Sequence, residues 1–267
     1  MKRVAVLGAR GFLGSYICHN LRNHIILPVT RQTLDLTDYD QVSAWLDQAH
    51  PDIIINCATA GGKTKLGDHN YSDLQNNVQL FLNFYNLSDK FHRFINIGSG
   101  AEFDRSLDIL QVQENDICRS NPSDSYGLSK NIIARLCLEK PNFCTLRLFG
   151  IFDSTEPDIR ILKKCQIQQE ITVNDCEFDM ISARDFLRIL DYYISVNEIT
   201  YQDINCVYRD KTTLESIVRH FASIHNANLR ISINRSATPK NYSGSGQRLA
   251  NLGLDLWGLN TGLEHYA

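Results

Sequence analysis

An apolar strand pattern followed at once by three evenly spaced glycines opens this chain and constrains its fold more than any other feature. Val4–Leu7 is an uninterrupted apolar run, which suits a strand buried on both faces at the centre of a parallel sheet. Gly8, Gly11 and Gly14 follow directly. In a strand-to-helix turn, glycines permit a tight bend, close approach of a ligand to the backbone and close packing of helix on strand. The pattern predicts an open α/β sheet whose first helix directs free amides at a phosphate.

The spacing Gly-x-x-Gly-x-x-Gly differs from the Gly-x-Gly-x-x-Gly of many dinucleotide-binding proteins, and three such glycines could be turn chemistry alone. Their place at the first strand–helix junction of an alternating chain favours nucleotide binding. Apolar periodicity and capping residues continue the alternation, which predicts a doubly wound parallel sheet. We expect helices over residues 12–23, 39–49 (capped by Asp38), 71–88, 124–139 and 213–225, and strands over 24–30, 51–58, 92–97, 203–207 and 229–233.

Composition and charge exclude several classes of protein. With 267 residues and 43% hydrophobic content, the chain can bury one large α/β core or a core with a smaller lobe. A formal net charge of −3 gives no generic attraction to nucleic acid or anionic membrane. No apolar run is long enough to span a bilayer and the first residues read as a strand rather than a signal peptide, so we expect a cytoplasmic protein. The eight scattered cysteines predict reduced packing residues, and the histidines lack metal-ligand spacing, so no metal is expected.

The end of the second expected strand indicates which dinucleotide binds. NAD sites usually place a carboxylate there for the ribose hydroxyls, whereas the 2′-phosphate of NADP requires cations. This chain has Thr30, Arg31 and Gln32 there, and Arg10 inside the glycine turn could reach the same phosphate. We therefore expect NADP, with NADPH preferred and NAD as the alternative, unless both arginines are solvated loop residues. Asp35 could accept a hydrogen bond from the adenine amino group.

Tyr126 and Lys130 lie four residues apart at the start of an expected helix, so they share one helical face. An ammonium beside a phenol favours the phenolate, which makes the tyrosine a usable proton donor or acceptor near neutral pH. Alone, Tyr-x-x-x-Lys is a weak pattern, because many solvated helices carry it. Its position after Ser99, which ends a buried strand pattern, increases its weight.

With the glycine turn, Ser99, Tyr126 and Lys130 in this order, the chain resembles the extended short-chain dehydrogenase/reductases, the NAD-dependent epimerase/dehydratase family of nucleotide-sugar enzymes. It most resembles the GDP-fucose synthases, which are similarly NADPH-linked, and the dTDP-4-dehydrorhamnose reductases. The resemblance implies a Rossmann-type doubly wound sheet with a small C-terminal substrate lobe. The NADP-binding part would span residues 1–152 plus about 180–208, and the lobe about 153–179 plus 209–267. Further matching segments are Asp35 in Asp-Leu-Thr-Asp, Asn77-Val78, Arg147-Leu-Phe-Gly150, Asp185 and Asn251-Leu-Gly253.

The resemblance also implies a role for each matching residue. Tyr126 would exchange a proton with the sugar oxygen, Lys130 would activate Tyr126 and hold the nicotinamide ribose, and Ser99 would position the substrate oxygen. Substrate contacts are expected from Ser99, Gly100, Tyr126 and Lys163, although Lys163 could equally lie on a solvated helix face. The residues expected to contact the cofactor are Gly8, Arg10, Gly11, Phe12, Leu13, Gly14, Arg31, Asp35, Leu36, Ala58, Tyr126 and Lys130.

Departures from the family pattern narrow the reaction. Sugar dehydratases of the family carry an Asp-Glu pair directly after the serine position, where this chain has Gly100 and Ala101. The cysteine and histidine that GDP-fucose synthases use for epimerisation are also missing: Ala101 occupies the first place, and no histidine occurs between Gly150 and Arg184. Hydride transfer with one proton remains. We therefore expect NADPH-dependent reduction of a nucleotide-linked 4-keto-(6-deoxy)sugar.

Two other functions stay open: an NAD-dependent nucleotide-sugar C4 epimerase, which would keep its cofactor tightly bound, and a catalytically silent NADP-binding regulatory subunit. The expected partner is a nucleotide-diphosphate sugar, with no nucleic acid and no membrane. Family members commonly form homodimers through two helices that include the one carrying Tyr126. We interpret Glu102 as structural, pointing away from Ser99 if the backbone stays extended. Residues 243–246 predict a hinge or a helix entry, and residues 59–62 a flexible loop.

Overall fold

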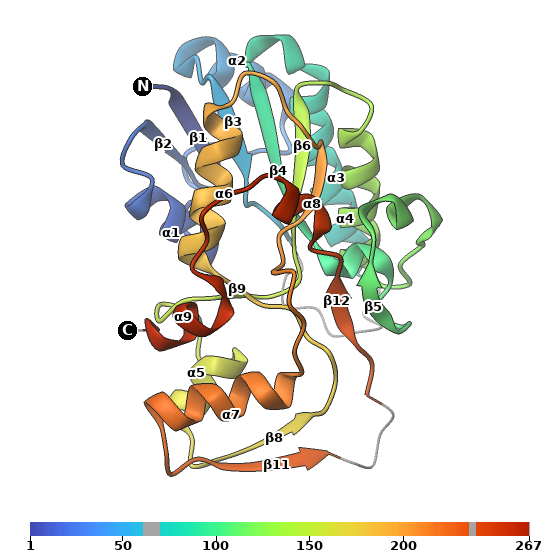
Figure 1. Ribbon diagram of the computed structural model, residues 1–267. Helices are drawn as coiled ribbons and strands as arrows, with labels where there is room; N and C mark the ends of the chain where they lie inside the picture. The colour runs from blue at the N-terminus through green and yellow to red at the C-terminus, as the bar shows by residue number, and fades with distance from the viewer. Residues whose placement is uncertain (61–69, 235–238, 267) are drawn as a thin grey trace.

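A six-stranded parallel sheet forms the centre of the molecule (Figure 1). The computed structural model describes residues 1–60, 70–234 and 239–266. All neighbouring strands in this sheet are parallel. The first strand of the chain lies between the second and the third, so the sheet extends from the first strand on both sides. The predicted Rossmann-type doubly wound sheet is therefore confirmed. The order of the strands is β10 (Asp203–Asn205), β6 (Phe143–Leu148), β4 (Arg93–Ser99), β3 (Ile53–Asn56), β1 (Arg3–Leu7) and β2 (Ile25–Val29).

Helices cover both faces of this sheet (Figure 1). In β1, Val4 and Val6 point into the core on one face, Ala5 and Leu7 point into the core on the other, and all four are fully buried. Burial on both faces explains why the strand reads as an unbroken apolar run rather than an alternating one. One face carries α1 (Phe12–Asn20) and α6 (Ala183–Ser195), and the other carries α2 (Tyr39–Ala49), α3 (Tyr71–Asn86) and α4 (Ser125–Cys137).

Helix α2 begins and ends where the sequence predicts. Its cap is also confirmed, because the Asp38 carboxylate accepts a hydrogen bond from the Gln41 amide at 3.0 Å. Helix α1 ends at Asn20 rather than at residue 23, since the backbone of Leu21 leaves the helical region with φ −82° and ψ 75°. Helices α3 and α4 also end slightly earlier than predicted. Apolar periodicity therefore located these four helices, but their last turns depend on where the chain must reverse. Helix α6, which packs on the same sheet, was not predicted.

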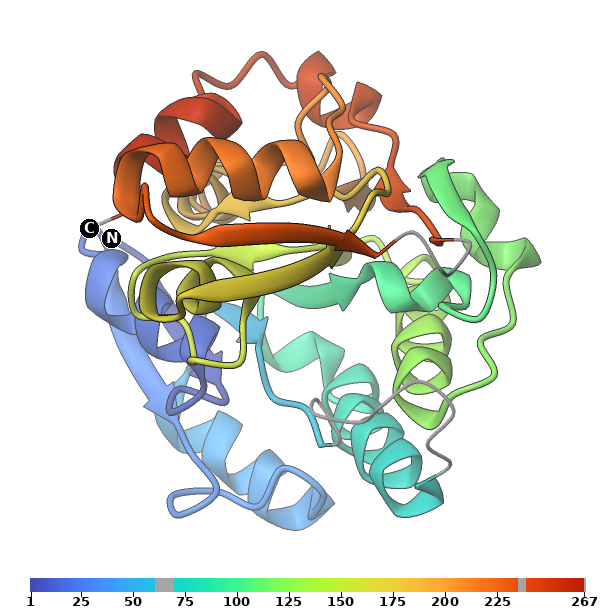
Figure 2. The same cartoon turned by 90° about the horizontal axis from the view of Figure 1, so that it is seen from below.

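A second hydrophobic core lies below the sheet in Figure 1 and includes Phe152, Leu162 and Phe221. The view from below shows the parallel strands β8 (Glu170–Asn174) and β11 (Arg230–Asn234) alongside the long helix α7 (Leu214–His225) (Figure 2). The predicted helix over 213–225 and strand over 229–233 are confirmed. Glu177 and Phe178, between β8 and β9 (Ile181–Ser182), form isolated bridges to Thr213 and Tyr242. The elements around this core are β7 (Ile151–Phe152), α5 (Ile161–Ile167), β8 (Glu170–Asn174), β9 (Ile181–Ser182), α7 (Leu214–His225), β11 (Arg230–Asn234) and α9 (Gly258–Glu264).

The last part of the chain returns to the main sheet. Arg248 Nη1 donates a hydrogen bond to the Asp203 carbonyl at 2.8 Å, which attaches helix α8 (Gln247–Asn251) to β10. Of residues 243–246, the first two belong to a strand and Gly246 precedes that helix. Within the described ranges, no helix is long and apolar enough to cross a membrane. The remaining elements are β5 (Ile109–Val112), which pairs with β12 (Tyr242–Gly244), α8 (Gln247–Asn251) and the 3₁₀ helices η1 (Ser88–Lys90), η2 (Gly100–Phe103) and η3 (Glu114–Arg119).

Candidate active site

The glycine turn between β1 and α1 has the geometry of a dinucleotide-binding turn. Gly8 has a φ of +77°, and a Cβ there would lie 2.8 Å from the Ala58 amide nitrogen, so this position requires glycine. A Cβ on Gly14 would overlap the Gly8 carbonyl oxygen, which shows how closely α1 packs on β1. A Cβ on Gly11 would meet only that oxygen, at 3.4 Å, an ordinary contact. The missing side chain of Gly11 therefore leaves room for a ligand rather than for packing.

The start of α1 offers free backbone donors to such a ligand. Its N-cap is Gly11 and has no side-chain cap, so the first-turn amides of Phe12, Leu13 and Gly14 are available to an anion. These amides and the helix dipole fit a pyrophosphate. Arg160 adds a cation, because its guanidinium carbon lies 5.5 Å from the Phe12 ring centroid. A cavity of about 430 Å³ opens here, lined by Arg10, Gly11, Phe12, Ser15, Tyr16, His19, Asn20 and Thr155.

The residues expected to select the cofactor lie at the ends of two paired strands. Arg10 Nη1 donates to Gln32 Oε1 at 2.7 Å, which joins the glycine turn to the segment after β2. Arg31 is exposed beside Gln32. Asp35 closes a local turn, accepting bonds from the amide and hydroxyl two residues ahead, while the Leu36 carbonyl accepts a bond from α3. Two guanidinium groups and no carboxylate therefore follow β1 and β2 directly, an arrangement that fits a 2′-phosphate.

Asn77 on α3 connects the segment after β3 to helix α4. Its Oδ1 accepts a hydrogen bond from the Ala60 amide at 2.7 Å, and its Nδ2 donates to Ser129 Oγ at 3.1 Å. Ser129 Oγ in turn donates to the Tyr126 carbonyl at 2.8 Å. The two glycines of the loop predicted over residues 59–62 lie outside the described residues. Asn77 therefore fixes the first turn of the helix that carries Tyr126 relative to the sheet.

Ser99, Tyr126 and Lys130 gather at the carboxyl edge of the sheet. Ser99 is the last residue of β4, and Tyr126 lies in the first turn of α4. Lys130, one turn later, is 4% exposed, and its Nζ donates to the Ile97 carbonyl at 2.8 Å. That bond places the ammonium against β4, two residues before Ser99. Tyr242 lies next to this group, because a Cβ on Gly100, the residue after Ser99, would be 2.8 Å from Tyr242 Cζ. Ligands of open α/β sheets bind at this edge.

Arg105 is a site residue that the sequence did not indicate. The buried Asp124 caps α4, accepting the Gly127 amide at 2.9 Å, and accepts a second bond from Arg105 Nη2 at 2.8 Å. The Arg105 guanidinium carbon lies 5.7 Å from the centroid of the Tyr126 ring, within the range of a cation–π contact. Arg105, itself held by Asp124, therefore packs against the Tyr126 ring. Arg105 stands in an irregular segment with no spacing relation to Tyr126, so no local pattern could have found it.

The segment after Ser99 forms η2, so the expectation of an extended backbone there is wrong. A reciprocal pair of bonds closes the turn: Ser99 Oγ accepts from the Ala101 amide at 3.2 Å, and Glu102 Oε1 accepts from the Ser99 amide at 2.8 Å. Glu102 is fully buried, and its Oε2 accepts from Arg147 Nε at 2.5 Å. Burial raises the pKa of Glu102, and the charge of Arg147 opposes that shift. Glu102 therefore has the structural role that was predicted, holding the turn that presents Ser99.

Tyr242 reaches this site from β12, far along the chain. Its ring packs at 5.2 Å, edge to face, on Phe149. A Cβ on Gly100 would lie 2.8 Å from Tyr242 Cζ and 2.6 Å from the Phe149 ring, so Gly100 makes room for these two rings. The contact of Gly100 with substrate stays a prediction. The sequence marked the glycine-rich stretch after Tyr242 but not Tyr242 itself, because only tertiary packing brings it next to Gly100.

Lys163 on α5 is occupied by local partners. Its Nζ donates to the Ser154 carbonyl and to Gln166 Oε1, both at 3.0 Å. Its amide donates to Glu156 Oε1 at 3.1 Å, and the same oxygen accepts the Tyr266 hydroxyl at 2.9 Å. Burial raises the pKa of Glu156 to about 7. These bonds attach Lys163 to residues near it in the sequence. Its predicted contact with substrate stays a prediction.

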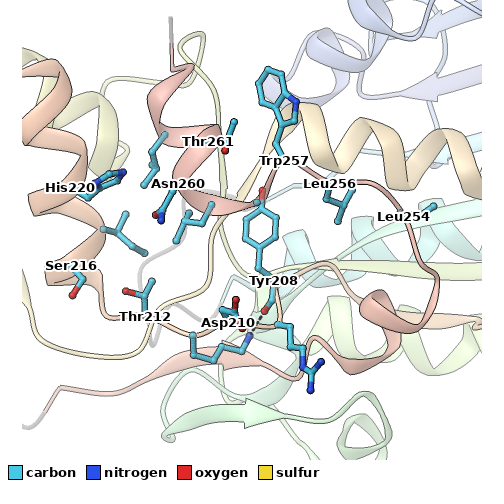
Figure 3. Close-up of a pocket in the computed structure, with 16 residues that line it drawn as sticks. Tyr208, Asp210, Thr212, Ser216, His220, Leu254, Leu256, Trp257, Asn260 and Thr261 are labelled. Atoms are coloured by element: carbon cyan, nitrogen blue, oxygen red, sulfur yellow. Dashed lines mark hydrogen bonds between the residues drawn. The ribbon is translucent and has the colours of Figure 1, made fainter.

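A separate cavity of about 810 Å³ opens between α7, α9 and residues 208–212 (Figure 3). Tyr208, His220 and Trp257 are among its lining residues, and in the described parts of the chain it shares none with the glycine turn or with the group at Ser99. Asp185 joins two of its walls, accepting the Tyr208 hydroxyl at 2.7 Å and the Trp257 amide at 2.9 Å. Asp185, which matches the family pattern, therefore makes structural contacts between the walls of this cavity.

Other proteins of known structure share this fold. The GDP-mannoheptose C4 reductase of Campylobacter jejuni, solved with NADP bound, has a TM-score of 0.80 and 15% identity, covering 98% of this chain and 96% of its own. A GDP-L-fucose synthetase of Naegleria fowleri has a TM-score of 0.83 and 15% identity, covering 99% and 92%. The dTDP-4-dehydrorhamnose reductase of Bacillus anthracis, solved in complex with NADP, has a TM-score of 0.80 and 18% identity, covering 100% and 98%. At these identities the likeness establishes the fold.

The sequence itself carries the family signal. No curated protein matches it, but the model of the NAD dependent epimerase/dehydratase family matches residues 4–195. That span is more than half of the chain, and it contains the glycine turn together with Ser99, Tyr126 and Lys130. This chain belongs to the NAD-dependent epimerase/dehydratase family.

Proposed function

We propose that this chain is a reductase that uses NADPH to reduce the 4-keto group of a nucleotide-linked sugar, of the 4-keto-6-deoxyhexose type. The observation that carries the proposal is the placement of Lys130. Its buried ammonium is bonded to the Ile97 carbonyl, beside the strand end that presents Ser99 and one helical turn from Tyr126. A cation fixed there stabilises negative charge on the tyrosine oxygen when its proton leaves. Such a group suits reversible proton transfer to a carbonyl.

The residues around the glycine turn fit a dinucleotide. The steric needs of Gly8 and Gly14, the open position at Gly11 and the uncapped amides of α1 all suit a pyrophosphate. Arg10 and Arg31 favour the 2′-phosphate of NADP over the bare ribose of NAD. NADP or NADPH is also named in several structures that share the fold. When bound, the reduced cofactor supplies the hydride that the side chains of the protein cannot provide.

Ser99, Tyr126 and Lys130 would polarise and protonate the carbonyl oxygen of the substrate. Ser99 donates a hydrogen bond to the carbonyl oxygen, which polarises the carbon–oxygen bond. As the carbon accepts hydride, the oxygen takes the hydroxyl proton of Tyr126 and becomes an alcohol. Lys130 then stabilises the tyrosine oxygen until solvent returns the proton. The overall change adds one hydride and one proton to the carbonyl.

The substrate class rests on two kinds of support. Ala101 is 1% exposed in a closed turn, and with Gly100 it replaces the acid pair that a dehydratase of the family would need. Several structures that share the fold are named as reductases or synthases of nucleotide-linked 4-keto sugars, including a GDP-6-OMe-4-keto-L-xylo-heptose reductase. Reduction at C4 therefore fits this site better than dehydration.

We also propose how the chain is divided into domains and how two copies associate. Residues 1–152 plus about 180–208 would form the NADP-binding domain, and about 153–179 plus 209–267 the substrate lobe. Two copies would pair through α3 and α4, which pack on each other through the Asn77–Ser129 bond. The protein would act in the cytoplasm, where NADPH and nucleotide sugars are made.

Calorimetric titration tests the proposal. Protein cleared of nucleotide is titrated with NADPH and NADH, and the cofactor complex with GDP, dTDP, UDP and CDP. Tight NADPH binding with selection of one diphosphate supports the reductase and names the keto-sugar to assay. Preference for NADH, or no diphosphate binding, overturns it. A cofactor retained through purification with no net NADPH consumption would instead identify a C4 epimerase, and binding without turnover in a stable enzyme complex a regulatory subunit.

A further inference from the structure

Arg105 packs on the Tyr126 ring from a segment that belongs neither to β4 nor to α4. Its guanidinium carbon lies 5.7 Å from the centre of the ring, within the distance over which a cation is attracted to an aromatic face. The Arg105 side chain is 27% exposed, so most of it is shielded from the water that would weaken its field. A partly buried positive charge therefore lies over the residue proposed to give its proton to the substrate.

A buried carboxylate holds Arg105 in this position. Arg105 Nη2 donates to Asp124 Oδ1 at 2.8 Å, and the Gly127 amide donates to the same oxygen at 2.9 Å. The Asp124 side chain is fully buried, and its Oδ2 has no hydrogen-bond partner within the described residues. Because Asp124 is also the N-cap of α4, the guanidinium is attached to the helix turn that carries Tyr126.

The same helix turn packs closely on the turn that presents Ser99. A Cβ on Gly127 would lie 2.6 Å from the Ala101 carbonyl oxygen and 2.9 Å from Pro122 Cβ, so the missing side chain allows α4 to approach η2. Tyr126 directly precedes Gly127, and Ser99 is the N-cap of η2. Arg105 therefore contacts the tyrosine at the end of α4 that lies against the Ser99 turn.

Two cations lie near Tyr126, and different elements hold them. Lys130 is bonded to the Ile97 carbonyl of β4 at 2.8 Å, whereas Arg105 is bonded to the cap of α4. In the proposed reduction the O–H bond of Tyr126 breaks, the proton forms the O–H bond of the alcohol, and the electron pair stays on the tyrosine oxygen. Conjugation spreads that negative charge into the ring, so a cation over the ring stabilises it more than it stabilises the neutral phenol. Asp124 offsets part of the positive charge, but the group over the ring is the guanidinium.

We propose that Arg105 is a positioning residue for the proposed reduction: its guanidinium, held by Asp124 over the Tyr126 ring, stabilises the negative charge that Tyr126 carries once its proton has left. The inference rests on the proposed function, because it requires Tyr126 to be the proton donor. It adds a second cation to the site, supplied by the irregular segment after η2.

The test separates the charge of Arg105 from its support of the fold. Arg105→Met alone leaves the buried Asp124 carboxylate unpaired, so it should lower both Tm and kcat. In Arg105→Met/Asp124→Asn no buried charge is left unpaired and the asparagine oxygen can still cap α4, so Tm should return close to that of the wild type. Because the cation is still missing from the Tyr126 ring, kcat should stay about 3- to 30-fold below the wild type. The NADPH dissociation constant should stay unchanged.

Three further variants complete the design. Arg135→Met is the matched control: Arg135 donates through Nη2 to the Ile117 carbonyl at 3.1 Å, and its loss should leave kcat unchanged. In Tyr126→Phe no negative charge forms on the ring, so adding Arg105→Met/Asp124→Asn should change the residual rate little. Arg105→Lys keeps the positive charge and should recover most of the kcat that is lost in Arg105→Met.

Each result decides between two levels of the account. If kcat of the double variant returns to the wild-type value together with Tm, Arg105 only supports the fold, and the positioning role is overturned while the reductase proposal stands. The role is also overturned if the same loss occurs in the Tyr126→Phe background or in Arg135→Met. If the double variant stays unstable, Arg105→Lys decides, because a kcat no higher than that of Arg105→Met overturns the role. If Tyr126→Phe turns over at the wild-type rate, the proposed function itself fails.

Discussion

Replacing Arg147 with methionine should strongly destabilise the fold, because two buried carboxylates depend on its charge. Arg147 is fully buried and pairs with Glu102 at 2.5 Å and with Asp203 at 2.8 Å. Removing one partner of a buried ion pair costs about 3–5 kcal/mol. In a chain of this length about 4 kcal/mol corresponds to a fall in Tm of roughly 10 °C. Thermal unfolding followed by circular dichroism measures it.

The pH dependence of that loss tests its cause. Burial raises the pKa of both Glu102 and Asp203, and the charge of Arg147 opposes both shifts. Without Arg147 both pKa values rise further. A carboxyl whose folded pKa is raised destabilises the fold as pH rises through that pKa and ceases to do so once protonated. The Tm deficit of Arg147→Met should therefore shrink as pH falls from 8 towards 5.

A second substitution separates charge from packing. Glu102→Gln removes one of the stranded charges, so the double variant Glu102→Gln/Arg147→Met should recover part of the stability lost by Arg147→Met alone. A deficit that is the same at every pH and is not relieved by Glu102→Gln would refute the electrostatic explanation. The loss would then belong to the cavity left by the guanidinium.

Two further predictions concern the cofactor turn and the second core. Gly14→Ala places a Cβ on the Gly8 carbonyl oxygen, so it should lower stability by about 1–3 kcal/mol and weaken NADPH binding in calorimetry; unchanged binding would contradict the packing described for this turn. Burial raises the pKa of Glu156 to about 7, so its contribution to stability is complete below the ordinary glutamate range and is lost as pH rises through about 7. Glu156→Gln should flatten the dependence of Tm on pH between 5 and 8.5, and an unaltered slope would show that Glu156 does not titrate there.

Features that depend on local sequence were predictable. The unbroken apolar run of β1 reports burial on both faces, and the capping residue Asp38 marks the start of α2, because each signal acts within a few residues. The glycine turn was also readable, since the need for Gly8 arises from its own backbone and the adjacent strand.

Features that depend on contacts between distant segments were not predictable. Glu102 was expected on an extended backbone, but its bond to the Ser99 amide and its pairing with Arg147 from another strand stabilise a 3₁₀ turn. Arg105 reaches Tyr126 from an irregular segment, and Tyr242 reaches Gly100 from the late strand β12. No spacing rule links such positions, so only the tertiary structure reveals them.

The rate of NADPH oxidation tests the central claim most directly. Wild-type protein and Tyr126→Phe are each mixed with NADPH and with GDP- or dTDP-linked 4-keto-6-deoxyhexose, and NADPH absorbance is followed. The account predicts turnover by the wild type with at least one of these substrates and a loss of about 100-fold or more in Tyr126→Phe, with NADPH affinity retained. Equal rates for the two proteins, or no oxidation of NADPH by the wild type with either substrate, would contradict it.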